Sequence, residues 1–194
     1  MNQATGRAGT GDEVVPGLPV RFRTDRLQLR PMADGDRALY VELYTDADVM
    51  RHVGAPLSPQ AAGRGFEAVQ RQMGQAPPRA WYWVACVRDS GREAGLLALM
   101  FDRGRESAEF GMMMPAWARG SGYATEAVGA LVAHALGGEG ATAAGSSLQR
   151  LHTRHAPGHA AGARVMAKLG FIAGPAEQGM AHWYLDRAGR GTRR

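Results

Sequence analysis

A glycine-rich stretch directly before a helical pattern is the part of the sequence best suited to chemistry. RGSGYATEA runs from Arg119 to Ala127, and an amphipathic pattern continues through Leu136. Glycine has no Cβ, so the backbone at Gly120 and Gly122 can approach a ligand closely. The first turn of a helix exposes unpaired N–H groups and the positive end of the helix dipole, where anions bind. The stretch therefore predicts a site for a phosphate-bearing molecule.

Two common phosphate-binding motifs do not account for this stretch. The P-loop pattern GxxxxGK[ST] is absent from the sequence. Gly120 and Gly122 form a GxG pair, but the third glycine of a dinucleotide fingerprint is missing and no βαβ unit opens the chain. A different pattern, R-x-x-G-x-A, is satisfied by Arg119, Gly122 and Ala124 between an expected strand and an expected helix.

The elements that must position this stretch follow from hydrophobic periodicity and turn residues. Strands are expected at 21–32 (interrupted by Thr24 and Asp25), 81–87, 93–101, 107–115, 148–155 and 181–187, and helices at 33–44, 59–73, 124–136 and 160–169. Ser58 can cap the second helix, with Pro59 at its first position. This order predicts a mixed α/β or α+β domain rather than a doubly wound Rossmann fold.

Length and composition favour one domain with flexible ends. The chain has 194 residues and 20.7 kDa, and we expect a disordered leader at 1–20, one domain at 21–187, a basic flexible tail at 188–194 and a low-complexity loop at 137–147. The sequence has no apolar run of ~18–20 residues that could span a membrane and no signal-peptide pattern. Cys86 is the single cysteine, which excludes an internal disulfide and a cysteine-based zinc cluster. A cytoplasmic location is therefore expected.

The positive charge invites a nucleic-acid interpretation that the sequence supports poorly. The formal net charge is +5 and the pI is near 10.0. Lys168 is the only lysine, and such arginine usage beside abundant alanine and glycine is typical of a compositional bias. No recognised nucleic-acid module accompanies the charge, so we rank this function last.

Four segments, in order, resemble the GCN5-related N-acetyltransferase (GNAT) superfamily over about residues 24–185. The R-x-x-G-x-A pattern is similar to its acyl-CoA signature. TDRLQLRP resembles the opening strand of the RimJ/RimL-like ribosomal-protein N-acetyltransferase branch, DADVMRHVG its post-helix segment, GYATEA its phosphate-binding helix start and RVMAKLGF its final helix. The resemblance implies the GNAT fold, a mixed and strongly twisted sheet flanked by helices. Acetyl-CoA is then expected to be wedged between the splayed fourth and fifth strands.

The resemblance also implies which residues would hold acetyl-CoA. Backbone amides of residues 119–124 would bind the pyrophosphate, and the strand at 110–114 would pair with the pantetheine arm. A backbone N–H near Met112 to Met114 would polarise the thioester carbonyl, although these methionines could equally be ordinary core residues. The expected cofactor-binding residues are Met112, Met113, Met114, Arg119, Gly120, Ser121, Gly122, Tyr123, Ala124, Thr125, His159 and Lys168.

Acetyl transfer to an amine needs a proton acceptor, an oxyanion donor and a proton for the departing thiolate. Glu109 corresponds to an acidic residue often found on this strand in the branch, and it is the first candidate for general base. The alternative is a structural carboxylate paired with an arginine. The tyrosine that protonates the thiolate in other GNAT proteins corresponds here to Met166. Tyr123, Tyr184, His159 or water could take its place.

The final-helix segment departs from the pattern of the branch, N-x-x-S-x-R-V-L-x-K-L-G-F, at two other positions. His159 stands in place of the asparagine and Gly162 in place of the serine. The spacing of His155 and His159 would suit a metal on a helix, but Pro157 and Gly158 argue against a helix there, so no metal site is predicted. Arg51, His52 and one of the aromatic residues at 81–83 could line the acceptor cleft.

The leading prediction is an enzyme that transfers acetyl from acetyl-CoA to a primary amine, with a protein N-terminal α-amine as the first acceptor. A small-molecule amine, such as an aminoglycoside, a polyamine or an amino acid, is the alternative acceptor, because a fold does not fix a substrate. The departures at 159, 162 and 166 also suit a CoA-binding module without catalysis. The expected partners are acetyl-CoA and the amine, with no membrane, and a homodimer is left open.

Overall fold

The computed structural model describes residues 13–15, 18–137 and 147–187. The predicted tail at 188–194 lies outside these residues, as does most of the glycine-rich loop at 137–147. None of the described helices is long and apolar enough to cross a membrane.

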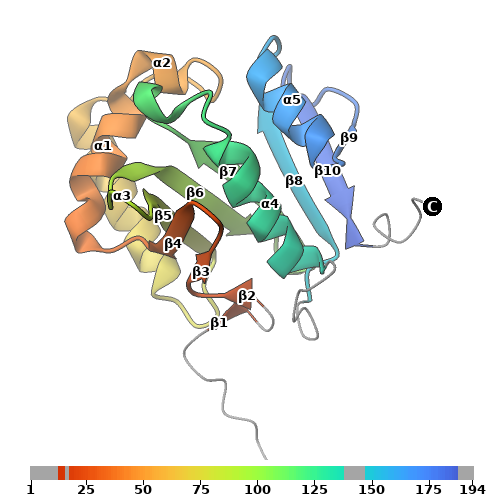
Figure 1. The fold of residues 1–194 in the computed structure, drawn as a ribbon, viewed down its shortest axis with the longest axis horizontal. Coiled ribbons are helices and arrows are strands. Elements are labelled where there is room, and N and C mark those ends of the chain that lie inside the picture. Colours follow the sequence, from red (N-terminus) through yellow and green to blue (C-terminus); the bar gives the residue numbers. More distant parts are fainter. Residues whose placement is uncertain (1–12, 16–17, 138–146, 188–194) are drawn as a thin grey trace, which may run out of the picture.

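The expected strands and helices appear in the predicted order (Figure 1). The strands are β1 (Glu13–Val15), β2 (Leu18–Pro19), β3 (Phe22–Arg23), β4 (Leu27–Pro31), β5 (Ala80–Val87), β6 (Glu93–Phe101), β7 (Ser107–Met113), β8 (Arg150–His155), β9 (Ile172–Ala173) and β10 (Ala181–Asp186). The helices are α1 (Arg37–Thr45), α2 (Ala47–Met50), α3 (Pro59–Met73), α4 (Tyr123–Leu136) and α5 (Ala160–Lys168), with 3₁₀ turns at Asp34–Asp36 and Ala116–Ala118.

Eight strands pair into one mixed sheet in the order β3-β4-β5-β6-β7-β8-β10-β9. Among the described strands of this sheet, only β7 and β8 pair in parallel, and the other neighbours are antiparallel. The break that the sequence predicted at Thr24 and Asp25 separates β3 from β4. A mixed sheet flanked by helices is therefore confirmed.

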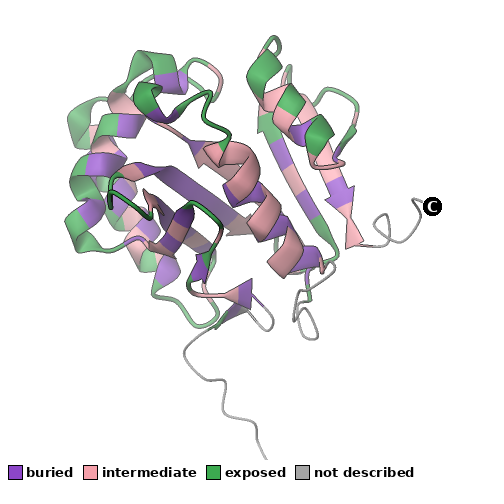
Figure 2. Ribbon diagram, in the orientation of Figure 1, coloured by how far each residue is buried: buried purple, intermediate pink, exposed green. Residues whose placement is uncertain are grey.

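Two apolar clusters cover the two faces of this sheet. One cluster packs α4 and α5 on residues such as Trp83 and Leu97, and the other packs α1, α2 and α3 on residues such as Tyr82 and Leu96. Neighbouring residues of a strand point to opposite faces, so the alternation along β5 and β6 divides the two clusters. Figure 2 shows the buried residues concentrated along the central strands.

The beginning of the described chain differs from the expected leader at 1–20. β1 and β2 pair with each other, and Val14 and Leu18 are buried in the cluster beneath α4. The carbonyl of Val20 accepts a hydrogen bond of 2.8 Å from Trp83 Nε1. Two strands of two or three residues are too short for periodicity to reveal, and burial against distant side chains stabilises them. The domain therefore begins before residue 21.

Side-chain caps set the starts of two helices, α2 and α3. Ser58 Oγ accepts a hydrogen bond of 3.2 Å from Ala61 N, which confirms the predicted cap of α3. Asp46 Oδ1 accepts from Asp48 N at 2.7 Å and from Val49 N at 3.0 Å, and this cap begins α2. The sequence analysis missed α2, since four residues make a single turn.

The strands β7 and β8 separate after three paired residues. Their register pairs Ser107–Glu109 with 150–152 and goes no further, although β7 continues to Met113 and β8 to His155. Figure 1 shows β8, β10 and α5 diverging from the rest of the sheet. This opening between the fourth and fifth long strands is the predicted splay.

Candidate active site

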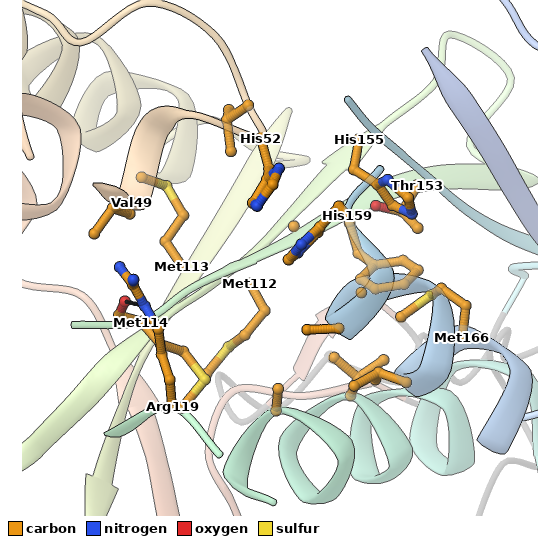
Figure 3. Close-up of a pocket in the computed structure, with 18 of the residues that line it drawn as sticks. Val49, His52, Met112, Met113, Met114, Arg119, Thr153, His155, His159 and Met166 are labelled. Atoms are coloured by element: carbon orange, nitrogen blue, oxygen red, sulfur yellow. Dashed lines mark hydrogen bonds between the residues drawn. The ribbon is translucent and has the colours of Figure 1, made fainter. Parts of the chain in front are cut away.

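A cavity of about 920 Å³ occupies the opening between β7 and β8. Its wall combines α1 and α2, the strands β5 to β8, the loop before α4, the first two turns of α4, and α5 along its whole length. The predicted site residues that line it are Glu109, Met112, Met113, Met114, Arg119, Gly120, Gly122, Tyr123, Ala124, Thr125, His159 and Lys168. Ser121 does not line it. Figure 3 shows several of these side chains converging from opposite walls.

The two glycines before α4 have the backbone conformation that the sequence suggested. Gly120 has φ of 75° and Gly122 has φ of 83°, values in the left-handed region that favours glycine. Gly122 is the N-cap of α4, and within the described chain no side chain caps this helix start. The N–H groups of this helix start therefore have no side-chain cap among the described residues, and the acid of the first turn, Glu126, is bonded to Thr24 and Arg26. A helix start of this kind fits a bound phosphate.

A hydrogen-bonded cluster holds this loop from the side of β3 and β4. The carboxylate of Glu126 on α4 accepts from Thr24 Oγ1 at 2.5 Å and from Arg26 N and Nε at 2.8 Å. Arg26 also donates to the Ser121 carbonyl at 2.9 Å, and its guanidinium lies 4.8 Å from the Tyr123 ring centre. Burial raises the pKa of Glu126, but the hydrogen bonds from Thr24 and Arg26 outweigh it and hold that pKa below its ordinary value.

The sequence analysis missed this cluster because its members lie about a hundred positions apart. Thr24 and Asp25 looked only like a turn or bulge between two strand segments. In the folded protein, that turn lies against the start of α4 and supports the glycine-rich stretch at 119–122. A hydrophobic pattern contains no information about such a pairing.

The three methionines at the end of β7 and just after it divide between the two faces of the sheet. Met113 pairs with Leu96 and belongs to the cluster beneath α1 to α3, whereas Met112 and Met114 pack against the cluster beneath α4. All three also line the cavity. They are therefore packed against the core and also lie in the cavity wall.

Glu109 lies at the last paired position of β7 and forms an ion pair with Arg154 on β8. Arg154 Nη2 is 2.9 Å from Glu109 Oε2, and Arg154 Nε is 3.2 Å from Oε1. Glu109 is thus paired with an arginine, which was the alternative to its role as a general base. Both oxygens are engaged, so proton uptake from an amine needs one of them to be shared with that amine or with water.

Three imidazoles meet at the mouth of the cavity (Figure 3). His159 stacks on His52 with ring centres 3.9 Å apart, and its edge meets His155 at 5.2 Å. The Nδ1 of His155 lies 2.9 Å from the Ala156 carbonyl and its Nε2 lies 3.0 Å from Trp183 Nε1. Donation from Trp183 Nε1 to Nε2 requires the proton of His155 to be on Nδ1.

His159 is neutral at neutral pH. Its pKa is lowered to about 4, first by burial and then by the positive charges of the nearby His52, His155, Arg51 and Arg119. Burial and Arg51 also lower the pKa of His52. A neutral His159 can accept a hydrogen bond in the cavity, but it carries no extra proton for a departing thiolate.

The departures at positions 159 and 162 form a matched pair. A Cβ added at Gly162 would lie 2.5 Å from His159 Cδ2 and 2.9 Å from His159 Nε2. The imidazole thus occupies the space that the serine of the family pattern would fill. Gly162 allows the ring to fold back over the first turn of α5, where it meets His52.

The two tyrosines that could donate a proton lie in different places. Met166, at the position of the family's tyrosine, is buried in the cavity wall and has no proton to donate, whereas Tyr123 lines the cavity from the start of α4. Tyr184 does not line the cavity, and its ring lies 4.6 Å from the guanidinium carbon of Arg150 on the β8–β10 ladder. Within the described residues, no group of three histidine, cysteine or acidic side chains could hold a metal ion.

Arg51 and His52, the candidates for the acceptor cleft, line the cavity together with Tyr82 from the aromatic run on β5. Trp83 is instead fully buried in the core. Tyr44 and Arg154 also line the cavity, and sequence reasoning missed them. Tyr44 looked like one more apolar position of a helix, and Arg154 like a charged residue on a strand.

Comparison with known families finds one match, to the model described as an acetyltransferase (GNAT) domain, over residues 26–172. No curated protein matches the chain by sequence. Among solved structures, spermidine N-acetyltransferase from Vibrio cholerae, in complex with CoA and spermine, superposes with a TM-score of 0.69 and 15% identity, covering 84% of this chain and 96% of that one.

Two other solved structures are similar to the same extent. RimL, a ribosomal-protein α-N-acetyltransferase in complex with CoA, has a TM-score of 0.68 and 15% identity, covering 87% of this chain and 96% of its own. The aminoglycoside acetyltransferase AAC(6')-Ib with coenzyme A has a TM-score of 0.65 and 17% identity, covering 84% and 95%. At these identities the structures share the fold with this chain, and their acceptors differ from one another.

Proposed function

Since the chain belongs to the GNAT family of acyl-CoA-dependent acetyltransferases, we propose that it transfers acetyl from acetyl-CoA to a primary amine, with a protein N-terminal α-amine as the leading acceptor. The observation that carries the proposal is the cavity between β7 and β8, which has the uncapped start of α4 at its edge. A cavity of about 920 Å³ is large enough for a cofactor-sized ligand.

The chain offers each part that acetyl-CoA would need. The backbone amides of residues 119–124 would bind the pyrophosphate, and Arg119 and Lys168 would add positive charge. Among the described residues, β7 has no partner strand on the β8 side after Glu109. Its residues 110–113 remain paired with β6, so the backbone groups that point away from β6 are available to an extended pantetheine arm. Bound acetyl-CoA supplies the activated thioester, and an N–H near Met112 to Met114 would stabilise the developing oxyanion.

We propose Glu109 and His159 as the groups that accept the amine proton, directly or through water, and Tyr123 as the group that protonates the thiolate. Location supports Tyr123, because Tyr184 does not line the cavity and His159 is neutral. The Tyr123→Phe variant should lower kcat about 10-fold or more while leaving acetyl-CoA affinity nearly unchanged. Equal loss of affinity and of kcat would instead indicate a binding role.

The acceptor assignment rests on the four segments that resemble the RimJ/RimL-like branch. A small-molecule amine is the second candidate, and the solved relatives favour keeping it, since spermidine and aminoglycoside acetyltransferases share the fold. N-terminal peptides, spermidine, an aminoglycoside and free amino acids, each assayed for release of the CoA thiol, separate the two. If only small amines react, the protein-modifying role is wrong.

Calorimetric titration of acetyl-CoA into the wild type and into the Gly122→Val variant tests the cofactor site. Valine strains a backbone with φ of 83° and its Cβ would approach Arg26, so we expect micromolar binding to be lost. Gly104→Val is the matched control, because Gly104 is exposed with open space around it. Absence of wild-type binding would contradict the proposal, and binding without turnover on any amine would favour a non-catalytic CoA-binding module.

A further inference from the structure

The charged side chains that line the cavity are mostly cations. Among the described residues, the lining acids are Asp48 and Glu109, and the lining lysine and arginines are Arg51, Arg119, Arg154, Arg164 and Lys168. The cavity therefore has three more positive than negative groups. Acetyl-CoA, bound as proposed, accounts for the positive groups beside its phosphates, and the acceptor side needs separate consideration.

The two lining carboxylates differ in how firmly they are paired. Both oxygens of Glu109 are bonded to Arg154, at 2.9 and 3.2 Å. Asp48 lies 3.8 Å from Arg51 on the surface of α2, and its side chain is 74% exposed to solvent. A polyamine or an aminoglycoside carries several positive charges, so it would have to displace Arg154 from Glu109 or rely on the solvent-exposed Asp48.

The floor of the acceptor side adds no negative charge. It is formed by Tyr44 and Tyr82 with Leu96, Ala98 and Met100, and Tyr82 Oη lies 3.9 Å from Met100 Sδ. Burial raises the pKa of both tyrosines, so their hydroxyls are neutral at any physiological pH. This floor suits an uncharged or apolar part of a substrate.

Arg51 lines the cavity and has only a weak ion pair. Its contact with Asp48 is long, at 3.8 Å, and the two side chains are 60% and 74% exposed, so this surface pair contributes little. Its Nε donates to His52 Nε2 at 3.2 Å, and the His52 ring stacks on His159, so this hydrogen bond holds the guanidinium beside the imidazoles of the cavity. The His52 carbonyl accepts from Ala156 N at 2.9 Å, so the backbone fixes this segment against the end of β8.

We propose that the acceptor carries an anionic group close to its reactive amine, and that Arg51, held by His52, binds this anion. The substrate is then an acidic N-terminal peptide or a free acidic amino acid rather than a polycation. This inference rests on the proposed acetyl transfer and narrows its acceptor. It also explains why the pocket can keep Glu109 paired with Arg154, because no second positive charge of the substrate must be matched.

The test uses acceptors that share one α-amine and differ in charge. The set is a serine-initiated peptide with glutamate at positions two and three, the same peptide with glutamine or with lysine there, free glutamate, and spermidine. We expect kcat/KM for the glutamate peptide to exceed that for the lysine peptide by at least 10-fold, with the glutamine peptide between them. Raising the salt to 0.5 M should reduce the preference, since salt screens exposed charges.

Variants assign the preference to Arg51. Arg51→Gln should reduce the glutamate-to-lysine ratio below twofold, and Arg51→Glu should invert it. Arg71→Gln is the matched control, because Arg71 is an exposed arginine on α3 outside the cavity, and it should leave the ratio unchanged. A ratio unaffected by Arg51→Gln would overturn the role of Arg51.

The outcomes separate this inference from the proposed function. Efficient acetylation of spermidine or of the lysine peptide would refute the anionic acceptor and leave acetyl transfer intact. If no amine is acetylated, the proposed function fails, and fluorescence anisotropy of the labelled glutamate and lysine peptides with the protein and CoA still decides the inference. Tighter glutamate-peptide binding that is lost in Arg51→Gln would support it, and equal binding would refute it. Comparison of kcat/KM for free glutamate with kcat/KM for the glutamate peptide shows whether the anionic acceptor is an amino acid or a peptide.

Discussion

At the scale of single residues, the site differs from the family pattern by coordinated exchanges. The imidazole of His159 fills the space above Gly162, where a Cβ would lie 2.5 Å from the ring. Stacking on His52 at 3.9 Å then places the imidazole across the mouth of the cavity. A departure that looks like a loss of function in the sequence is therefore accommodated by its neighbour.

The coupling of positions 159 and 162 is testable by a double-mutant cycle. Gly162→Ser alone should push the imidazole out of its place and weaken acetyl-CoA binding about 10-fold, measured by calorimetry. His159→Asn combined with Gly162→Ser restores both residues of the family pattern, and we expect it to recover most of that loss. Ala167→Ser, on an exposed position of α5, should have no effect. Additive losses in the double variant would contradict a matched pair.

The lowered pKa of His159 predicts a pH dependence of stability. The folded pKa is about 4 against an ordinary 6.5, so the unfolded chain binds more protons between these values. The free energy of unfolding should therefore fall as the pH drops below 6.5. Urea titrations from pH 4.5 to 7.5 should show a shallower decline for His159→Asn. Proton NMR of the ring, titrating near 6.5 in the folded wild type, would refute the assignment.

At the scale of elements, the start of α4 is held by the turn between β3 and β4, which lies 100 residues earlier in the sequence. Glu126 links the helix to Thr24 and Arg26, and Arg26 reaches the carbonyl of Ser121 within the glycine loop. To hold the proposed phosphate, this helix start must stay rigid although glycines give its backbone freedom. The β3–β4 turn supplies that rigidity.

Replacing Glu126 should cost both stability and cofactor affinity. Glu126→Gln keeps the shape of the side chain but loses the charge-assisted hydrogen bonds, and we expect the free energy of unfolding to fall by about 1–3 kcal/mol. Acetyl-CoA affinity should fall as well, because the loop is less ordered before binding. Urea denaturation and calorimetry measure the two effects. Glu67→Gln, on an exposed position of α3, is the control. An unchanged affinity would contradict a supporting role for the cluster.

At the scale of the whole molecule, the cavity lies where the sheet divides. On one side are α1 to α3 with the strands up to β7, and on the other are β8, β10 and α5. The two strands at the division are paired over three residues only. A ligand in the opening would touch both parts and would replace the missing strand contacts between them.

Bound acetyl-CoA should therefore stabilise the whole domain. At a free concentration of 100 times Kd, the free energy of unfolding should rise by about 2.7 kcal/mol, equivalent to roughly 5–10 °C in Tm for a chain of this size. Amide hydrogen exchange should slow in β8 and α5 as well as at the start of α4. The Gly122→Val variant should show neither change. Protection confined to α4 would contradict a ligand that joins the two parts.

The sequence by itself determined the features that depend on neighbouring residues. Alternation predicted the strand that contains β4, apolar runs bounded by turn residues predicted β5 to β7, and Ser58 with Pro59 predicted the start of α3. The glycine pair before α4 predicted the start of that helix. Elements of two to four residues, such as β2 and α2, escaped because so few residues hold no period.

The tertiary structure alone decided which distant side chains meet. It joined Glu126 to Arg26, paired Glu109 with Arg154, and brought His52 beside His159. It also left Ser121 and Tyr184 outside the cavity wall. Local sequence fixes backbone conformation through steric and capping effects that act within a few residues. Contacts across a hundred residues depend instead on how the helices and the sheet pack, and that packing is a property of the whole chain.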